Sequence, residues 1–355
     1  GDLVVYIPAD ALLPQWMLIS LDMWSEEKAQ GLLSGKNGDR CKPIRLRGIF
    51  SEGILVPTHY VPHRETTFLQ YIDKDSNLED WDWKHIEVKE GDDVTEILGV
   101  KKYEPIIPES MGGEVFYAGD IFYHYDLESI MKYPNVLKEG EEVRVTEKIH
   151  GTQTRIHFTL EKYNETDECL EFNMTALDKL YVYIASKGQG DKGLCFKNNE
   201  TNENCIYLKA FYNTFLPNKT DILILFKIFS ELKTHIKNMT FFGETFGNVQ
   251  DLHYGIKSNE NNKLNIFDIY IDKHFVDNDT LKEWCNYLGI NMVPLLYQGP
   301  YSYEKIKELT DGKSIYDENQ IREGCVITPL VERRDEELGR VILKSVSEDY
   351  KMRKG

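Results

Sequence analysis

The sequence predicts an α+β protein in which a small β-barrel precedes a larger domain of mixed strands and helices. In the first hundred residues, short strand-like runs are separated by turns, as in small barrels. A segment rich in proline and glycine then breaks the periodicity, and strand-like and helix-like runs follow it. We therefore expect a barrel over residues 1–100, a linker over 101–121 and a second domain over 122–355.

The barrel prediction depends on four segments. Residues 3–7 and 44–50 have strand patterns, and the second alternates so that Arg45 and Arg47 share one face. A turn at 51–53 then leads to a strand at 54–56, which suggests a hairpin. Residues 92–98 have a helical pattern, with Asp92 or Asp93 as the cap.

The second domain mixes both periodicities. We expect strands at 143–147, 181–185, 241–242 and 264–271. We expect helices at 127–131 and 280–288, the latter ending at Gly289. The longest apolar run, 222–226, is far shorter than the roughly 18 residues of a membrane helix, so we expect a buried segment and no membrane association.

Charge and cysteine content restrict the partners. The chain has 42 basic and 59 acidic residues, a net charge of −17, so a nucleic-acid partner would require a locally basic cleft. Hydrophobic residues make up 41 %, enough for a large core. The six cysteines include no C-x-x-C pair, which favours reduced thiols in an intracellular protein, cytoplasmic or nuclear.

The clearest local signal for chemistry is the segment 146–152, T-E-K-I-H-G-T. It places Lys148 at the end of a strand beside a glycine turn, where its amine would lie at the edge of a pocket. A lysine pKa of about 10.4 must fall before the amine can act as a nucleophile, and neighbouring lysines or a metal ion would lower it. On its own, such a tetrapeptide is more often a surface hairpin.

The order of five further segments favours the reactive lysine. They are S-K-G-Q-G at 186–190, F-G-E-T-F-G at 242–247, I-F-D-I-Y at 266–270, R-E-G-C-V-I at 322–327 and V-I-L-K-S-V at 341–346. With the lysine segment, they resemble motifs I, Ia, III, IIIa, IV and V of the covalent nucleotidyltransferase superfamily of ATP-dependent ligases and capping enzymes. Each segment is weak alone, but the ordered set is specific.

The K-I-H-G form resembles RNA ligases more than the K-x-D-G form of DNA ligases. The leading segments at 1–8 and 45–48 resemble the OB domain that precedes the catalytic domain in the fifth RNA ligase family. DNA ligases and capping enzymes carry that domain after motif V, where only a short segment follows Lys344 here. The resemblance implies an N-terminal OB-fold β-barrel, then an ATP-grasp-like nucleotidyltransferase domain with antiparallel sheets and flanking helices.

The resemblance also implies residue roles. Lys148 would be adenylated by ATP to give lysyl-AMP, and Lys344 would neutralise charge near the α-phosphate. Glu244 would contact the ribose or a metal-bound water, and Phe267 would stack on adenine. Glu323 would bind a divalent ion, Mg²⁺ or Mn²⁺, through water.

Other motif positions are less specific. We assign Glu147, Ile149, Gly151 and Lys187 to nucleotide binding, although Lys187 could equally contact the 5′-phosphate strand or serve as an ordinary surface lysine. His150 replaces the usual aspartate, so it could bind metal through water or not at all.

One motif cation is missing. Val346 stands where motif V usually has a second lysine. Arg340, Lys351 or an arginine of the barrel could supply that charge.

The expected function is an ATP-dependent RNA ligase that seals 3′-OH and 5′-phosphate ends or nicks, with RNA on the 3′-OH strand. We expect a monomer with a basic groove that contains Lys148, Lys187, Lys344 and the arginines Arg45 and Arg47. A DNA ligase, a capping guanylyltransferase and a non-catalytic RNA-binding module remain alternatives.

Overall fold

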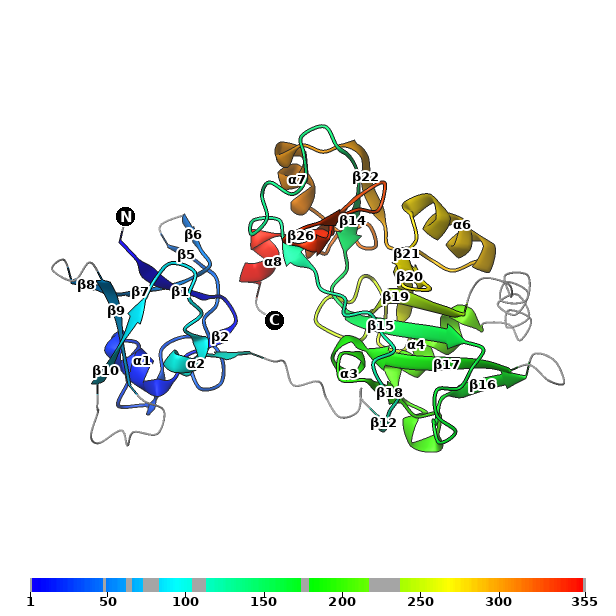
Figure 1. Cartoon of the computed structure of the whole chain (residues 1–355), viewed down its shortest axis with the longest axis horizontal. Helices are drawn as coiled ribbons and strands as arrows, with labels where there is room; N and C mark the ends of the chain where they lie inside the picture. The colour runs from blue at the N-terminus through cyan, green and yellow to red at the C-terminus, as the bar shows by residue number, and fades with distance from the viewer. Residues whose placement is uncertain are drawn as a thin grey trace. The chain divides into compact units, whose positions relative to one another are not determined.

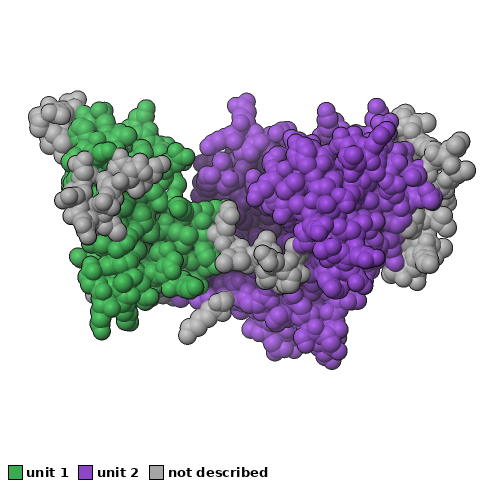
Figure 2. Space-filling view, turned by 90° about the horizontal axis from the view of Figure 1, so that it is seen from below, with its two compact units in different colours: residues 1–106, 354 green, residues 107–353, 355 purple. Residues whose placement is uncertain are grey.

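The computed structural model describes residues 2–46, 49–61, 66–72, 83–103, 113–173, 179–216 and 237–353. The chain forms two compact units, unit 1 over Gly1–Ile106 and unit 2 over Ile107–Arg353 (Figure 2). No helix in the described ranges is long and apolar enough to cross a membrane. The apolar run at 222–226 and Arg47 lie outside the described residues.

Unit 1 consists of short antiparallel strands and short helices (Figure 1). The strands pair as β1–β7, β2–β11, β3–β4, β5–β6 and β8–β9–β10, and no closed barrel forms among the described residues. Its elements are β1 Val4–Pro8, β2 Ala11–Leu12, α1 Gln15–Ser20, β3 Trp24–Ser25, β4 Gln30–Gly31, β5 Ile44–Leu46, β6 Ile49–Ser51, β7 Gly53–Pro57, β8 His59–Val61, β9 Thr66–Ile72, β10 Trp83–Val88, α2 Thr95–Leu98 and β11 Lys101–Lys102.

Two predictions for unit 1 are wrong in detail. Residues 44–50 are not one strand, because β5 and β6 are separate strands that pair with each other. The expected hairpin does not form either, since β7 pairs with β1 from the start of the chain. The predicted strand at 3–7 is confirmed as β1, and the Asp93 carboxylate accepts a hydrogen bond from the Thr95 N–H at 2.9 Å as α2 begins.

Unit 2 is organised around two sheets. Its described residues form a six-stranded antiparallel sheet in the order β16-β17-β15-β19-β20-β21 and a five-stranded sheet in the order β13-β26-β23-β14-β22. The elements are β12 Val115–Tyr117, β13 Glu128–Ser129, β14 Glu142–Lys148, β15 Thr152–Thr159, β16 Leu170–Asn173, β17 Lys179–Ser186, α3 Lys187–Gly190, β18 Leu194–Phe196, η3 Glu200–Asn202, α4 Ile206–Phe215, β19 Asn238–Phe246, β20 Lys263–Ile271, β21 His274–Phe275, α6 Asn278–Leu288, β22 Leu295–Pro300, α7 Tyr303–Thr310, β23 Gly324–Pro329, β24 Arg334–Asp335, β25 Gly339–Arg340, β26 Leu343–Val346 and α8 Glu348–Met352.

The six-stranded sheet buries one face against α4 (Figure 1). Phe211 and Phe215 are four residues apart on α4 and therefore lie on the same side of the helix. Both rings pack against Phe158 of β15. A second core lies between the five-stranded sheet and α7, where Ile306 joins buried side chains of β14 and β23. These cores hold both sheets in place around the segment that joins them.

That joining segment contains the lysine motif. β14 belongs to the five-stranded sheet, and β15, which begins only four residues after Lys148, belongs to the six-stranded sheet. The chain therefore passes from one sheet to the other directly after Lys148.

Local predictions in unit 2 succeed where one strong pattern dominates. The strands expected at 143–147, 181–185, 241–242 and 264–271 are confirmed, as is the helix that ends at Gly289. The helix expected at 127–131 is wrong, because Glu128–Ser129 forms β13 and pairs in parallel with Leu343 and Lys344. The expected linker also contains a strand, since β12 pairs with β18.

Candidate active site

Unit 2 contains a pocket of about 70 Å³ that is lined from both sheets. β14 and β23 supply one wall, and β19 and β20 supply another. Five residues predicted from the sequence lie on its surface: Glu147, Lys148, Ile149, Glu244 and Phe267. With Val326 and Ile342 also in the lining, the fold brings residues of five of the six motif segments to one cavity.

Lys148 and Glu244 line this pocket, and Glu323 lies beside Lys148. The Lys148 Nζ lies 2.5 Å from the Glu323 Oε1. Burial opposes the charge on Lys148, but Glu323 and Glu244 together raise its pKa. Burial raises the pKa of Glu244 to about 8, with Lys148 opposing and Glu323 adding to the rise. In this arrangement Lys148 holds its proton, so the amine must be freed before it can attack a phosphorus atom.

Two close backbone approaches set this geometry. A Cβ atom on Gly151 would lie 2.2 Å from the Thr245 carbonyl oxygen, so only glycine allows the motif turn to lie directly against β19. A Cβ atom on Gly324 would lie 2.0 Å from the Ser345 carbonyl oxygen. Gly324 pairs with Val346 of β26, which fixes the end of β23 next to Glu323. Glycine at these two positions thus places both glutamates around Lys148.

The lysines predicted from the sequence lie near one another. Lys344 is on β26 opposite Val326, which lines the pocket. Burial lowers the pKa of Lys344, and the charge of Lys148 adds to this effect. Lys187 begins α3, forms an ion pair with Asp126, and also lowers the Lys344 pKa through its charge. Lys148 on β14 and Lys344 on β26 thus lie on the two strands that flank β23, opposite Gly324 and Val326.

The rest of the pocket combines apolar and polar surface. Phe267 lines it from β20 and meets the Tyr125 ring edge to face, with centroids 5.3 Å apart. The Glu147 Oε2 accepts a hydrogen bond from the Ile315 N–H at 2.8 Å. Burial raises the pKa of Glu147, whose other oxygen has no hydrogen-bond partner among the described residues. The buried Glu147 carboxylate is therefore held by the loop after α7.

His150 points toward other partners. Its Nε2 lies 2.8 Å from the Asp251 Oδ1, and its Nδ1 lies 2.7 Å from the Tyr350 hydroxyl oxygen. The Glu323 Oε2 is 3.7 Å from the same Nδ1. The described residues include no group of three His, Cys, Asp or Glu side chains arranged to ligate one ion, so water-mediated metal binding stays a prediction.

Sequence patterns missed a second charged cluster in the same pocket. Arg340 donates to both oxygens of Asp268 at 2.8 and 2.9 Å, and to both oxygens of Glu332 at 3.1 and 2.5 Å. The Tyr125 hydroxyl donates to Asp268 as well. Two carboxylates neutralise Arg340, which makes it a poor source for the missing motif V cation.

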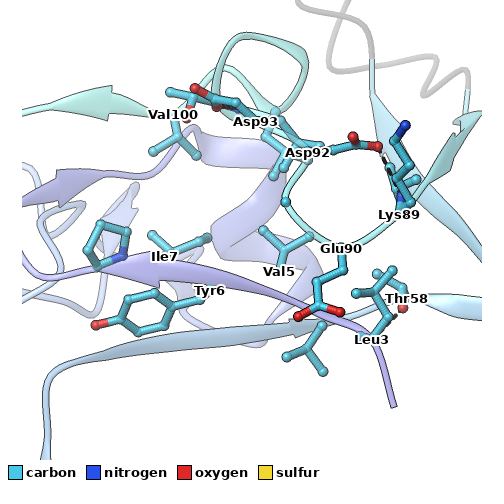
Figure 3. A pocket seen from close by; sticks show the side chains of 17 residues that line it. Leu3, Val5, Tyr6, Ile7, Thr58, Lys89, Glu90, Asp92, Asp93 and Val100 are labelled. Atoms are coloured by element: carbon cyan, nitrogen blue, oxygen red, sulfur yellow. Dashed lines mark hydrogen bonds between the residues drawn. The ribbon is translucent and has the colours of Figure 1, made fainter. Parts of the chain in front are cut away.

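Unit 1 has a separate pocket between β1 and the loop after β10 (Figure 3). Val5 and Ile7 of β1 face the loop residues Glu90 and Asp92 across it. None of the site residues predicted from the sequence lines this pocket, and acidic side chains at its edge would repel phosphates. The chemistry suggested by the motifs therefore belongs to unit 2.

Comparison with known proteins agrees with this geometry. No curated protein matched the chain in sequence. The chain resembles Naegleria gruberi RNA ligase solved with PPi, with a TM-score of 0.62, 21 % identity and coverage of 99 % of this chain and 86 % of that chain. A mutant of that ligase with ATP and Mn gives a TM-score of 0.62 and 20 % identity, and the match covers 99 % of this chain and 87 % of that chain. Another mutant, with AMP and Mn, gives a TM-score of 0.62 and 20 % identity, and the match covers 99 % of this chain and 86 % of that chain.

The family model described as RNA ligase matches residues 141–346, more than half of the chain. This stretch begins just before β14 and ends with β26, so it contains every strand that lines the pocket. The chain therefore belongs to the RNA ligase family.

Proposed function

We propose that this protein is an ATP-dependent RNA ligase whose nucleophile is Lys148. The observation that carries the proposal is a pocket lined by Lys148, Glu244 and Phe267, in which Lys148 is paired with Glu323. The Naegleria structures that share the fold contain ATP or AMP with Mn, which supports a nucleotide in the corresponding pocket here.

In this proposal the adenine of ATP lies against Phe267, and the α-phosphate lies between Lys148 and Lys344. The Lys148 amine attacks the α-phosphorus and pyrophosphate leaves, which gives lysyl-AMP. AMP is then transferred to the 5′-phosphate of RNA, and a 3′-OH displaces it to form the phosphodiester. Lys344 would stabilise the charge that develops on the α-phosphate, and positioning would supply most of the remaining rate enhancement.

Glu244 and Glu323 are suited to a divalent cation, Mg²⁺ or Mn²⁺, held through water, with His150 beside them. Burial raises the pKa of Glu244 to about 8, and the neighbouring Glu323 carboxylate adds to the rise, so this end of the pocket favours added positive charge. When bound, the ion would lower the Lys148 pKa and neutralise phosphate charge. Glu323 would meanwhile keep the Lys148 side chain beside the phosphate.

RNA ends or a nicked duplex would be the substrate, with RNA on the 3′-OH side. We further propose that unit 1, with its short antiparallel strands, is an OB-type module that contributes to RNA binding. Six buried free thiols support an intracellular site of action. The expectation of a monomer stays a prediction.

The deciding experiment is incubation with ATP labelled at the α-phosphorus and Mg²⁺ or Mn²⁺, followed by a denaturing gel. We expect a labelled protein band that Lys148→Ala abolishes and that Lys307→Ala, at an exposed lysine of α7, leaves unchanged. Label from GTP alone would indicate a capping enzyme. No label from either nucleotide, after bound AMP is removed with pyrophosphate, would leave an RNA-binding protein.

The choice between RNA and DNA needs a second assay. Nicked duplexes with either RNA or DNA on the 3′-OH side should be sealed at different rates, with the RNA-ended nick faster. Equal rates on both nicks would favour the DNA ligase alternative.

A further inference from the structure

The short helix α8, Glu348–Met352, follows the motif V strand directly and contacts the lysine motif. Its N-cap is Ser347, whose hydroxyl accepts the Tyr350 N–H at 3.3 Å and whose own N–H donates to the Glu323 carbonyl at 2.9 Å. This cap directs Tyr350 toward His150. The two rings meet nearly edge to face, with centroids 5.3 Å apart and planes at 73°.

Arg353, the C-cap of α8, contacts both Tyr350 and Asp251. Its guanidinium lies over the Tyr350 ring, 3.6 Å from the centroid, and binds both oxygens of Asp251 at 2.8 and 3.1 Å. The Asp251 Oδ1 also lies 2.8 Å from the His150 Nε2. The Arg353 Nη2 lies 3.0 Å from the same Nε2, and the Tyr350 hydroxyl oxygen lies 2.7 Å from the Nδ1, so polar partners on both ring nitrogens hold the imidazole in this orientation.

The His150 ring lies beside Glu323, which in turn contacts Lys148. The Glu323 Oε2 is 3.7 Å from the His150 Nδ1, while its Oε1 is 2.5 Å from the Lys148 Nζ. One side of Glu323 therefore faces the nucleophile and the other faces the histidine that α8 holds. If His150 rotated, the carboxylate would lose the neighbour that limits its own rotation.

We propose that Tyr350 and Arg353 are positioning residues for lysine adenylation, because they fix the His150 ring and, through it, the Glu323 carboxylate beside Lys148. This inference rests on the proposed function. None of the six motif segments includes either residue. The role depends on histidine at this motif position, because the ring presents one nitrogen to Tyr350 and the other to Asp251.

The test compares Tyr350→Phe with the unsubstituted protein in two backgrounds. Single-turnover adenylation should slow by roughly tenfold, as is typical when a group that orients a ligand is removed, with little change in the KM for ATP. In a His150→Asn background, Tyr350→Phe should cause no further slowing, because its effect acts through the ring. Tyr287→Phe, at an exposed tyrosine of α6, is the matched control and should leave the rate unchanged.

A second measurement needs neither ATP nor metal. In ¹⁵N spectra of the imidazole nitrogens, assigned with His150→Asn, Tyr350→Phe should shift the Nδ1 resonance of His150 and leave the other histidines in place. Arg353→Met should shift the Nε2 resonance, and it provides a second variant if Tyr350→Phe does not fold.

The outcomes separate the two proposals. Equal slowing by Tyr350→Phe in both backgrounds, or an unchanged His150 spectrum in a folded variant, would overturn the positioning role alone. Absence of any adenylate on the unsubstituted protein would overturn the proposed function, and the positioning role with it.

Discussion

Two buried charge clusters share the pocket of unit 2, and they are balanced in opposite ways. In one, Asp268 and Glu332 surround Arg340 with four hydrogen bonds, and Tyr125 donates a further one to Asp268. In the other, Lys148 has one short contact to Glu323, and burial raises the pKa of Glu244 to about 8. The first cluster holds its charges firmly, whereas the second contains a carboxyl group that titrates near neutral pH.

This contrast distinguishes structural from reactive ion pairs. A buried pair whose hydrogen bonds are all satisfied gains little from a ligand, and removal of one partner leaves an uncompensated charge. A cluster with displaced pKa values in a pocket can exchange protons or counterions during a reaction. We therefore expect substitutions in the Arg340 cluster to affect stability, and substitutions around Lys148 to affect chemistry.

The largest effect on stability should come from Arg340→Met. It leaves Asp268 and Glu332 without their cation inside the protein, which should lower the free energy of unfolding by about 3–5 kcal/mol. Urea denaturation at 25 °C measures the loss. Arg334→Met, at an exposed arginine of β24, is the control and should change stability by less than about 0.5 kcal/mol. A similar small loss for both variants would contradict the structural role of the cluster.

Lys344→Ala should slow catalysis and leave stability nearly unchanged. Removal of a fixed cation near the α-phosphate should slow lysine adenylation by about 10²–10³-fold, while urea unfolding changes little. Single-turnover labelling measures the rate, and Lys307→Ala serves again as the exposed control. If Lys344→Ala adenylates at the normal rate, another cation acts at the phosphate and the assignment of motif V is wrong.

In the protein without metal, Glu244 should make the free energy of unfolding depend on pH. Its pKa of about 8 lies above the ordinary 4.5, so between these values the folded protein binds more protons than the unfolded chain. The free energy of unfolding should therefore fall as the pH rises through this window, by at most about 1.4 kcal/mol per pH unit.

Glu244→Gln should remove that slope, whereas Glu304→Gln, at an exposed glutamate of α7, should preserve it. Urea denaturation at several pH values compares the three proteins. His157 affects the same curve with the opposite sign, because burial lowers its pKa to about 4. The comparison therefore uses the difference in the free energy of unfolding between the unsubstituted protein and Glu244→Gln at each pH. If that difference does not change with pH, Glu244 titrates normally.

The smallest effect should come from Glu332→Gln. Arg340 keeps its two bonds to Asp268, and the amide oxygen of glutamine can still accept one more, so we expect a loss of about 1 kcal/mol. Urea denaturation beside Arg340→Met tests the ranking. A loss as large as that of Arg340→Met would mean that Glu332, rather than Asp268, is the main partner.

The reactive cluster could be predicted from the sequence, but its structural counterpart could not. Lys148, Glu244 and Phe267 lie in ordered segments with a recognisable chemistry, and the structure places all three on the pocket. Arg340 and Asp268 are 72 positions apart and carry no pattern that links them. The contact between Tyr350 and His150 spans 200 positions and was missed for the same reason.

Errors in the predicted elements have a related cause. Residues 127–131 have a local helical pattern, yet Glu128 pairs with Leu343 on a strand more than two hundred positions away. Likewise β7 pairs with β1 rather than with its neighbour in sequence. Local periodicity carries no information about such partners, so strands of two or three residues were the hardest elements to predict.

The passage of the chain from β14 to β15 connects the active site to distant parts of unit 2. Lys148 ends a strand of the five-stranded sheet, whereas Glu244 lies in the six-stranded sheet, so their separation depends on the spacing of the two layers. Ile149, which follows Lys148 in the segment between β14 and β15, packs in a buried cluster with Phe246 and Val293. Changes in the volume of that cluster should therefore tune the reactivity of the lysine, and they offer a way to alter the catalytic rate without replacing any charged residue.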